Sequence, residues 1–537
     1  MSRSVRERVP GRGRNRLRGL IAALALAALA WSAPAGSAGA DGDDSGLPQA
    51  LDGILADARM SGGQESVTVA DADSGDVLYQ HTSGNRLMPA SNTKLLTSTA
   101  AMAVLGPDYR FSTDVLSTGR QHGTVLNGDL YLRGTGDPTL LAEDYDQLAA
   151  QLAGAGVKQV TGRLVADDTR FDDQRLGRSW AADDEASYYS AQISALAVAP
   201  NTDYDTGTVI TTITPGAAVG DKAKVTVTPP THYVHVDVTA TTAPAGDDGG
   251  ITVDRAHGTN DITISGSIPA DADPDMEWVT VWDPTGYAAA VFRDALAAHG
   301  VHVLGPTSLG RATPDGARTL ATHDSMQLKD LLIPFLKLSN NMHAEILTKA
   351  MGVKTAGEGS WDAGLAAVDD YLKGLGLDTA QLRQVDGSGL SRMDNVPAET
   401  FAELLVKVRH EPWFDDWYKG LPVACDPDRF VGGTLRSRMC DTPAALNARG
   451  KTGTLTGASS LSGYVTDAGG RKLVYSILLN NFLADSVTDI QDAIVVTLAS
   501  SSADKAVTVS PRSLHEDKAA EQDGAGLECA WLKPQMC

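Results

Sequence analysis

Ser91 and Lys94 are the first residues in this sequence whose types and spacing could do chemistry; they lie in Pro-Ala-Ser-Asn-Thr-Lys, residues 89–94. Side chains three positions apart share one face of a helix, so the amine can reach the hydroxyl. A serine hydroxyl is a weak nucleophile until a base takes its proton, and a lysine held neutral by burial or by nearby cations can serve as that base. An N-terminal position in a helix would also favour developing negative charge. Because many helices begin with a capping serine, this pair alone decides nothing.

A second polar group follows much later, in Leu-Ser-Asn-Asn, residues 338–341. The hydroxyl of Ser339 can relay a proton, and the carboxamide of Asn341 can hold both a lysine and a substrate carbonyl. The ordinary alternative is a helix cap followed by an asparagine in a loop.

A third group, Lys451-Thr452-Gly453-Thr454, precedes an expected hairpin. On a strand edge, the lysine and the threonine hydroxyls can bind a substrate carboxylate, while the glycine leaves room for a backbone to approach. Exposed N–H groups of such an edge can pair with an added peptide strand. The ordinary alternative is a β-turn that contains glycine.

The three groups occur in the order helix start, loop between helices, and edge strand, and this combination carries the argument. It matches the S-x-x-K, S-D-N and K-T-G set, with Asn340 in place of the middle Asp. The chain therefore resembles the low-molecular-mass class C penicillin-binding proteins, which are D-alanyl-D-alanine carboxypeptidases and endopeptidases. The long stretch between Ser91 and Ser339 resembles that family, which inserts extra domains there, and exceeds what a β-lactamase has.

The resemblance extends to segments outside the three motifs and covers roughly residues 45–500. These segments are 130–140, 180–201, 287–305 and 386–392.

Specific roles are implied by this resemblance. Ser91 would be acylated, Lys94 would be its general base, and Ser339 would pass a proton to the leaving amine. Asn341 and Lys451 would complete the polar cluster. Penicillins would act as covalent inhibitors, and no cofactor or metal is implied.

The resemblance also implies a set of substrate-binding residues: Thr452, Gly453, Thr454, Asp184 and Arg392. The backbone N–H groups of Ser91 and Thr454 would form the oxyanion hole. In the family, an acidic residue of the inserted region meets the free amine of the peptidoglycan stem peptide. Asp184 matches that position, and Asp183 is the competing choice.

The resemblance implies an α/β (α+β) fold, in which an antiparallel sheet is flanked by helices and interrupted by inserted, mainly β domains. Hairpins are expected at 66–79 and 461–480 and a helix at 94–105. The transpeptidase-like domain would comprise 41–110 and 307–510, with the insertion at 111–306. Residues 205–266, rich in Thr and Val, predict a small all-β unit. A polar tail would follow from 511 to 537.

The first 40 residues have the pattern of a signal peptide: seven arginines, an apolar run over 20–31, and small residues at 38–40. That run is shorter than the roughly 20 residues a spanning helix needs, which disfavours an uncleaved anchor. Its removal would take the formal charge from −22 to −28. Such acidity speaks against a nucleic-acid partner, so we expect a secreted protein of the cell-wall space that acts on stem peptides.

The four cysteines, Cys425, Cys440, Cys529 and Cys537, favour disulfides in an exported chain. Three connectivities are possible, and pairing of sequence neighbours is our prediction. His323 and His343 are isolated in the sequence without an acidic partner for a Ser-His-Asp triad, so we expect surface or capping roles for them.

Two alternatives stay open, one within the hydrolases and one from another class. One is a β-lactamase-like hydrolase, and the other is a non-catalytic penicillin sensor that keeps the fold. The intact set of five polar side chains argues against the sensor. The balance between carboxypeptidase and endopeptidase action, the diamino acid of the stem peptide and the oligomeric state are not determined by the sequence.

Overall fold

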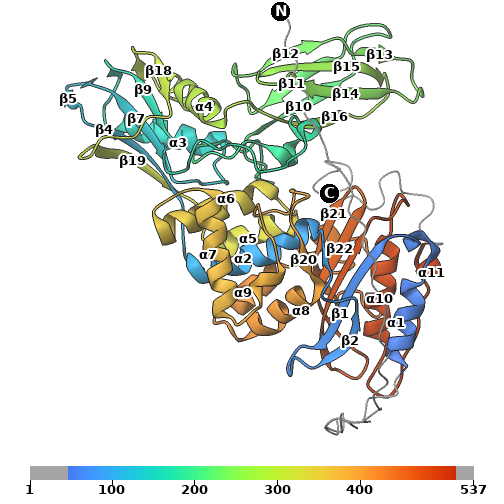
Figure 1. The fold of residues 1–537 in the computed structure, drawn as a ribbon. Coiled ribbons are helices and arrows are strands. Elements are labelled where there is room, and N and C mark those ends of the chain that lie inside the picture. The colour runs from blue at the N-terminus through green and yellow to red at the C-terminus, as the bar shows by residue number, and fades with distance from the viewer. Residues whose placement is uncertain (1–45, 516–537) are drawn as a thin grey trace, which may run out of the picture. The chain divides into compact units, whose positions relative to one another are not determined.

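A computed structural model of the protein describes residues 46–515 and contains a five-stranded antiparallel sheet built from both ends of the chain. The strand order is β2 (Val77–His81), β1 (Gln64–Asp71), β23 (Lys472–Asn480), β22 (Ala458–Thr466) and β21 (Arg449–Leu455). In Figure 1 the blue β1 and β2 lie beside the orange-red strands of the C-terminal part. Both predicted hairpins are confirmed, and β21 forms one edge of the sheet.

Helices cover both faces of this sheet. Successive side chains of a strand point to opposite faces, so both faces have to be buried when both carry apolar residues. Along β23, Leu473, Tyr475 and Ile477 join the core beneath α1 (Leu47–Leu55) and α10 (Thr488–Ser500). The intervening Val474 and Leu478 face α8 (Ala398–Lys407) and the other helices. The predicted antiparallel sheet flanked by helices is confirmed (Figure 1).

The second helical group surrounds α2 (Thr93–Val104), which begins one residue before the predicted helix. Nearly all of α2 is buried, which explains its composition of small and apolar residues. The helices around it are α5 (Leu328–Lys337), α6 (Asn341–Ala356), α7 (Trp361–Gly374) and α9 (Phe414–Gly420). Together these helices form one hydrophobic core.

The inserted region begins with a five-stranded sheet in the order β18-β9-β7-β4-β19. Its strands are β4 (Ser112–Ser117), β7 (Leu130–Gly134), β9 (Leu164–Asp167), β18 (Thr307–Leu309) and β19 (Arg318–Asp324). A smaller sheet, β17-β8-β6-β5, contains β5 (Arg120–His122), β6 (Val125–Asn127), β8 (Gln159–Val160) and β17 (His302–Val303). Helices α3 (Ala142–Gly154) and α4 (Pro284–Ala298) pack beside these sheets.

Two strands that lie after residue 306, the expected end of the insertion, pair with strands of the inserted region. Strand β18 pairs with β9, and β19 pairs with β4 across about 200 residues of sequence. We therefore propose that the insertion extends to Asp324, because hydrogen-bonded strands of one sheet belong to one folding unit.

The small all-β unit also extends beyond its predicted end at 266. Strand β10 (Thr208–Thr214) pairs with both β11 (Lys224–Thr228) and β16 (Asp275–Thr280). A second sheet holds β12 (His235–Val238), β13 (Thr241–Ala243), β14 (Gly250–Arg255) and β15 (Asp261–Pro269).

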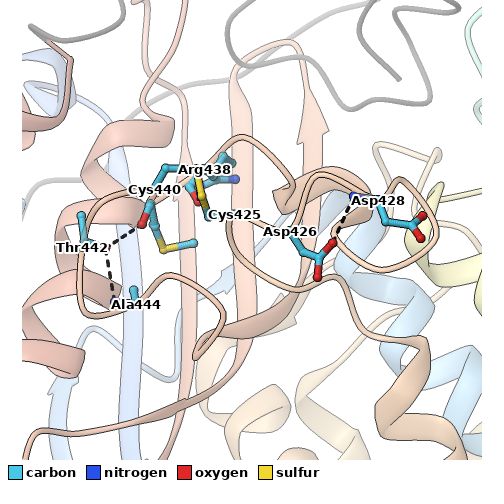
Figure 2. The surroundings of a disulfide bond; sticks show 8 residues. Cys425, Asp426, Asp428, Arg438, Cys440, Thr442 and Ala444 are labelled. Atoms are coloured by element: carbon cyan, nitrogen blue, oxygen red, sulfur yellow. Dashed lines mark hydrogen bonds between the residues drawn. A yellow bond between two sulfur atoms is a disulfide. The ribbon is translucent and has the colours of Figure 1, made fainter.

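Cys425 and Cys440 form a disulfide bond, with their Cα atoms 5.0 Å apart, so this predicted pairing is confirmed (Figure 2). The bridge closes a loop of 15 residues. Within that loop, the hydroxyl of Thr434 accepts a hydrogen bond from Thr452 Oγ1 at 2.8 Å. The disulfide therefore braces the segment that lies beside β21.

Replacing both Cys425 and Cys440 by alanine should lower the free energy of unfolding by about 3 kcal/mol, because the unfolded chain regains the entropy of a loop of this length. Chemical denaturation of wild type and variant, each with and without reductant, measures this. Reductant should destabilise the wild type and leave the variant unchanged. Equal stability of the two proteins without reductant would show that the bridge adds nothing.

Three expectations fall wholly or partly outside the described residues, namely the signal peptide at 1–40, the Cys529–Cys537 pair and most of the polar tail at 511–537. The expected polar tail begins instead with a short helix, α11 (Pro511–His515), because Leu514 packs against the core beneath α10. Among residues 46–515, no helix is both long enough and apolar enough to span a membrane.

Candidate active site

Ser91 lies in a short 3₁₀ turn, Ala90–Asn92, that leads directly into α2. Lys94, in the first turn of α2, is fully buried, and its Nζ lies 2.7 Å from Ser91 Oγ. The structure thus brings together the two side chains that the spacing predicted. A buried amine at this distance can receive the hydroxyl proton of a nucleophile.

Asn341 and a backbone carbonyl hold Lys94 in this position. Lys94 Nζ donates to Asn341 Oδ1 at 2.7 Å and to the carbonyl oxygen of Ser388 at 3.0 Å. These two acceptors can take both N–H groups of a neutral amine, which leaves its lone pair for the Ser91 hydroxyl. The Asn341 amide group in turn donates to the carbonyl of Tyr189 at 2.9 Å.

Lys451 lies on the other side of the site, on β21. It is fully buried, and its Nζ donates to Ser339 Oγ at 2.8 Å and to its neighbour's carbonyl, Thr452 O, at 2.7 Å. The backbone carbonyl of Lys451 accepts a hydrogen bond from Asn92, next to Ser91. All five predicted polar side chains therefore belong to two lysine-centred groups: Lys94 with Ser91 and Asn341, and Lys451 with Ser339.

Gly453 allows β21 to pass close to the nucleophile. A Cβ atom at this position would lie 2.8 Å from the backbone nitrogen of Ser91 and 2.7 Å from the carbonyl oxygen of Pro89. Any side chain here would push the strand away. Glycine thus allows the backbone of β21 to lie directly beside that of Ser91.

Two residues of the site have left-handed backbone conformations that are uncommon outside glycine. Ala90, directly before the nucleophile, has a φ of 48°, and Ser339 has a φ of 57°. Such conformations cost on the order of 1–3 kcal/mol each and persist where the surroundings fix them. One of these conformations lies directly before the Ser91 hydroxyl, and the other lies at Ser339 itself.

Asn340, which stands in place of the expected Asp, is the N-cap of α6. Its side-chain oxygen accepts from the backbone N–H of His343 at 3.2 Å, and its amide group donates to Tyr204 O at 3.0 Å and to Asp205 Oδ1 at 3.2 Å. This residue therefore anchors α6 to the inserted region. A neutral amide suits it because the neighbouring carboxylate needs a donor.

Asp184 and Arg392 are placed differently from each other. The Asp184 carboxylate accepts from Tyr189 Oη at 2.9 Å, and Tyr189 is the residue whose carbonyl holds Asn341. Asp183 is exposed, whereas Asp184 is half-buried. The exposed Arg392 donates to the carbonyl of Thr456 at 3.0 Å, at the turn between β21 and β22. It therefore lies outside the two lysine-centred groups.

The expectation of a surface role was wrong for His343, and the expectation that His323 has no acidic partner was wrong as well. His343 is fully buried in α6, where its Nε2 lies 2.9 Å from Tyr204 O. His323 lies 3.7 Å from Asp137 Oδ2 and 3.6 Å from Asp144 Oδ1, which come from a distant part of the chain. Within residues 46–515, no group of three or more His, Cys, Asp or Glu residues is arranged to hold a metal ion.

Sequence reasoning missed the contribution of backbone carbonyls to the site. The carbonyls of Ser388 and Tyr189 hold Lys94 and Asn341, and no residue type marks a carbonyl in advance. Both residues lie in segments that resemble the family, 386–392 and 180–201, so the resemblance offered the available signal.

The same fold occurs in the crystal structure of penicillin binding protein 4 (dacB) from Haemophilus influenzae. The superposition has a TM-score of 0.71 at 24% sequence identity and covers 81% of this chain and 94% of that one. The structure of the same protein complexed with a novel β-lactam gives a TM-score of 0.66 and covers 82% and 94%.

Sequence comparison identifies relatives over nearly the whole chain. A D-alanyl-D-alanine carboxypeptidase of Actinomadura sp. (strain R39) is 44% identical over 491 residues, which cover 91% of this chain and 90% of that protein. The D-alanyl-D-alanine carboxypeptidase DacB of Haemophilus influenzae is 26% identical over 410 residues, covering 76% and 83%. Residues 47–501 match the D-Ala-D-Ala carboxypeptidase 3 (S13) family. The resemblance to the penicillin-binding carboxypeptidases is confirmed, and the chain belongs to the D-Ala-D-Ala carboxypeptidase 3 (S13) family.

Proposed function

We propose that this protein removes the terminal D-Ala of peptidoglycan stem peptides through an acyl-enzyme on Ser91. The observation that carries the proposal is the buried Lys94 amine, 2.7 Å from both Ser91 Oγ and Asn341 Oδ1. Family membership gives the reaction class, and this geometry supports the assignment of roles to residues.

In the acylation step, Lys94 takes the proton of the Ser91 hydroxyl while Oγ attacks the carbonyl carbon of the penultimate D-Ala. The backbone N–H groups of Ser91 and Thr454 stabilise the resulting oxyanion. The C–N bond then breaks as Ser339 gives a proton to the leaving amine. The proton that Lys94 took from Ser91 then restores the hydroxyl of Ser339. In the second half of the reaction, Lys94 takes a proton from water as the water oxygen attacks the ester carbon, and it gives that proton to Ser91 Oγ as the ester C–O bond breaks.

Substrate binding is proposed to use β21. Its edge position supports pairing with an extended peptide, and Lys451 with the hydroxyls of Thr452 and Thr454 supports capture of the terminal carboxylate. Arg392 stays a candidate for a more distant contact. A β-lactam would meet the same groups and acylate Ser91.

A secreted protein of the cell-wall space fits this substrate, and the signal-peptide pattern of residues 1–40 supports that location. Mass spectrometry of the intact protein after penicillin treatment, with the labelled peptide located, tests the acyl-enzyme. The rate at which the adduct is lost separates a carboxypeptidase, with a lasting adduct, from a β-lactamase-like hydrolase. A non-catalytic sensor would bind penicillin and leave D-Ala-D-Ala peptides intact.

Asp184 is proposed to select substrates with a free side-chain amine. Asp184→Ala should weaken kcat/KM for such a stem peptide by about 1.5–3 kcal/mol, as for loss of a hydrogen bond to a charged group. Acylation by a simple penicillin without that amine should change little, because the attack by Ser91 stays intact.

The neighbouring Asp183 provides the matched control, since it carries the same charge and is exposed. Asp183→Ala should leave both reactions near wild-type rates. Equal losses on peptide and penicillin in Asp184→Ala would mean that Asp184 acts through Tyr189 on the reactive groups instead of through the substrate.

A further inference from the structure

The turn at residues 386–391 connects the reactive lysine to buried carboxylates. Gly389 has a φ of 84°, and a Cβ there would lie 1.8 Å from the carbonyl oxygen of Ala90, so the turn packs directly against the residue before the nucleophile. Its carbonyl groups point toward α2, while its N–H groups point toward acidic side chains on the opposite side.

One peptide group of this turn joins Lys94 to an acidic side chain. Its carbonyl, from Ser388, accepts from Lys94 Nζ at 3.0 Å. Its N–H, from Gly389, donates to Asp386 Oδ1 at 2.7 Å. Hydrogen bonds in a chain polarise one another, so a carboxylate on the N–H side makes the carbonyl oxygen a stronger acceptor.

The preceding peptide group repeats the arrangement one helical turn along α2. The Gly387 carbonyl accepts from Thr97 Oγ1 at 2.7 Å, and the Ser388 N–H donates to Glu345 Oε1 at 2.8 Å. The turn is therefore a clamp on α2 with two contacts. In one, a peptide group that is hydrogen-bonded to Asp386 accepts from the Lys94 amine. In the other, a peptide group that is hydrogen-bonded to Glu345 accepts from the Thr97 hydroxyl.

We infer that Asp386 is a positioning residue that acts through the Ser388–Gly389 peptide group to orient Lys94 and to stabilise the ammonium ion that forms when Lys94 takes the Ser91 proton. This inference rests on the proposed role of Lys94 as general base. It adds a group that touches neither substrate nor nucleophile.

Hydrogen bonds fix the position of the Asp386 carboxyl group. Three N–H donors converge on it: those of Gly389 and Ser391, each at 2.7 Å, and Trp180 Nε1 at 2.9 Å. Such donors stabilise a carboxylate. Burial, and then the charge of Asp386, raises the pKa of the neighbouring Asp394 well above its usual value, so that carboxyl keeps its proton.

Other charged groups around this cluster come from separate elements. Burial raises the pKa of Glu345 on α6, and the Asp386 charge adds to the effect. Lys349, one turn later on α6, is paired with Asp172. Lys451 on β21 is the second lysine of the site and contacts Ser339. Asp386 is therefore the carboxylate joined to Lys94 through a single peptide group.

The test is the pH dependence of penicillin acylation in Asp386→Asn. Without the carboxylate the ammonium form of the base is less stabilised, so the amine stays neutral down to lower pH. We expect the acid limb of the rate profile to move down by about one pH unit. The plateau rate should fall about tenfold, because the base is weaker and less well held. If this variant does not fold, Asp386→Ser gives the same comparison, since its hydroxyl can accept the Gly389 N–H.

Thr97→Val is the matched control, because it removes the other contact between the clamp and α2 without changing a charge. It should lower thermal stability and leave the acid limb at the wild-type pH. If the acid limb of the pH–rate profile does not move in Asp386→Asn, or moves equally in Thr97→Val, then Asp386 has only a structural role. Lys94→Ala keeps the two ideas separate: if that variant acylates normally, the proposed base is wrong, and if it is slow while Asp386→Asn keeps the wild-type limb, only the present inference fails.

Discussion

Ser91→Ala should abolish covalent labelling by penicillin and lower kcat/KM on a D-Ala-D-Ala peptide by about 10⁶-fold, the order of loss that follows removal of a serine nucleophile. The expectation rests on the place of Ser91 between the buried Lys94 amine and the backbone of β21. No adduct should appear in the intact mass, because the remaining hydroxyls lack this combination. Labelling that persists in the variant would assign the nucleophile elsewhere.

Ser98 provides a matched control on the same helix. It is fully buried, and its Oγ accepts from Trp417 Nε1 at 2.8 Å. Ser98→Ala should therefore lose some stability and still label completely with penicillin. A comparable loss of labelling in both variants would indicate that the helix, and not the Ser91 hydroxyl, is what the substitution disturbs.

Lys94→Ala should slow acylation by about 10²–10⁴, which is the usual contribution of a general base. Stopped-flow measurement with a chromogenic β-lactam gives the rate constant directly. Lys94→Arg separates base from charge, since a guanidinium stays protonated and cannot take the Ser91 proton. We expect the arginine variant to be as slow as the alanine variant.

Fast acylation in Lys94→Arg would mean that a positive charge is enough at this position. The base would then be sought at Lys451, whose Nζ lies 2.8 Å from Ser339 Oγ. Normal acylation in Lys94→Ala would lead to the same search. Either result leaves the family assignment intact and changes only the route of the proton.

The contact between Ser91 and Lys94 could be predicted from the sequence because it depends on local geometry, whereas Ser339, Asn341 and Lys451 were predicted from the set of three motifs. The i, i+3 spacing of Ser91 and Lys94 gives their contact on any helix. The bounds of strand β23 were predicted to the residue, because its side chains alternate between two sheet faces that are both buried. Asp184 was ranked above Asp183 by resemblance alone, and that order stays a prediction.

What could not be predicted depends on pairing between distant segments. Strand β19 lies beyond the expected end of the insertion, yet it pairs with β4. His323 gains acidic neighbours only because the fold brings α3 and the end of β7 to it. Likewise, the turn that holds Lys94 acts through backbone groups, whose direction is set by tertiary structure and not by residue type.

The shared sheet has a consequence for the order in which the protein can fold. Strand β1 is flanked by β2 and by β23, and some 400 residues separate β1 from β23 in the sequence. Closing so long a loop delays the pairing, and topologies dominated by such contacts fold slowly. A chain that emerges from its N-terminus therefore exposes an incomplete sheet edge until its last strands arrive. Ser91 gains its β21 neighbours only then, so a protein cut short before residue 449 would carry the nucleophile and be unable to use it.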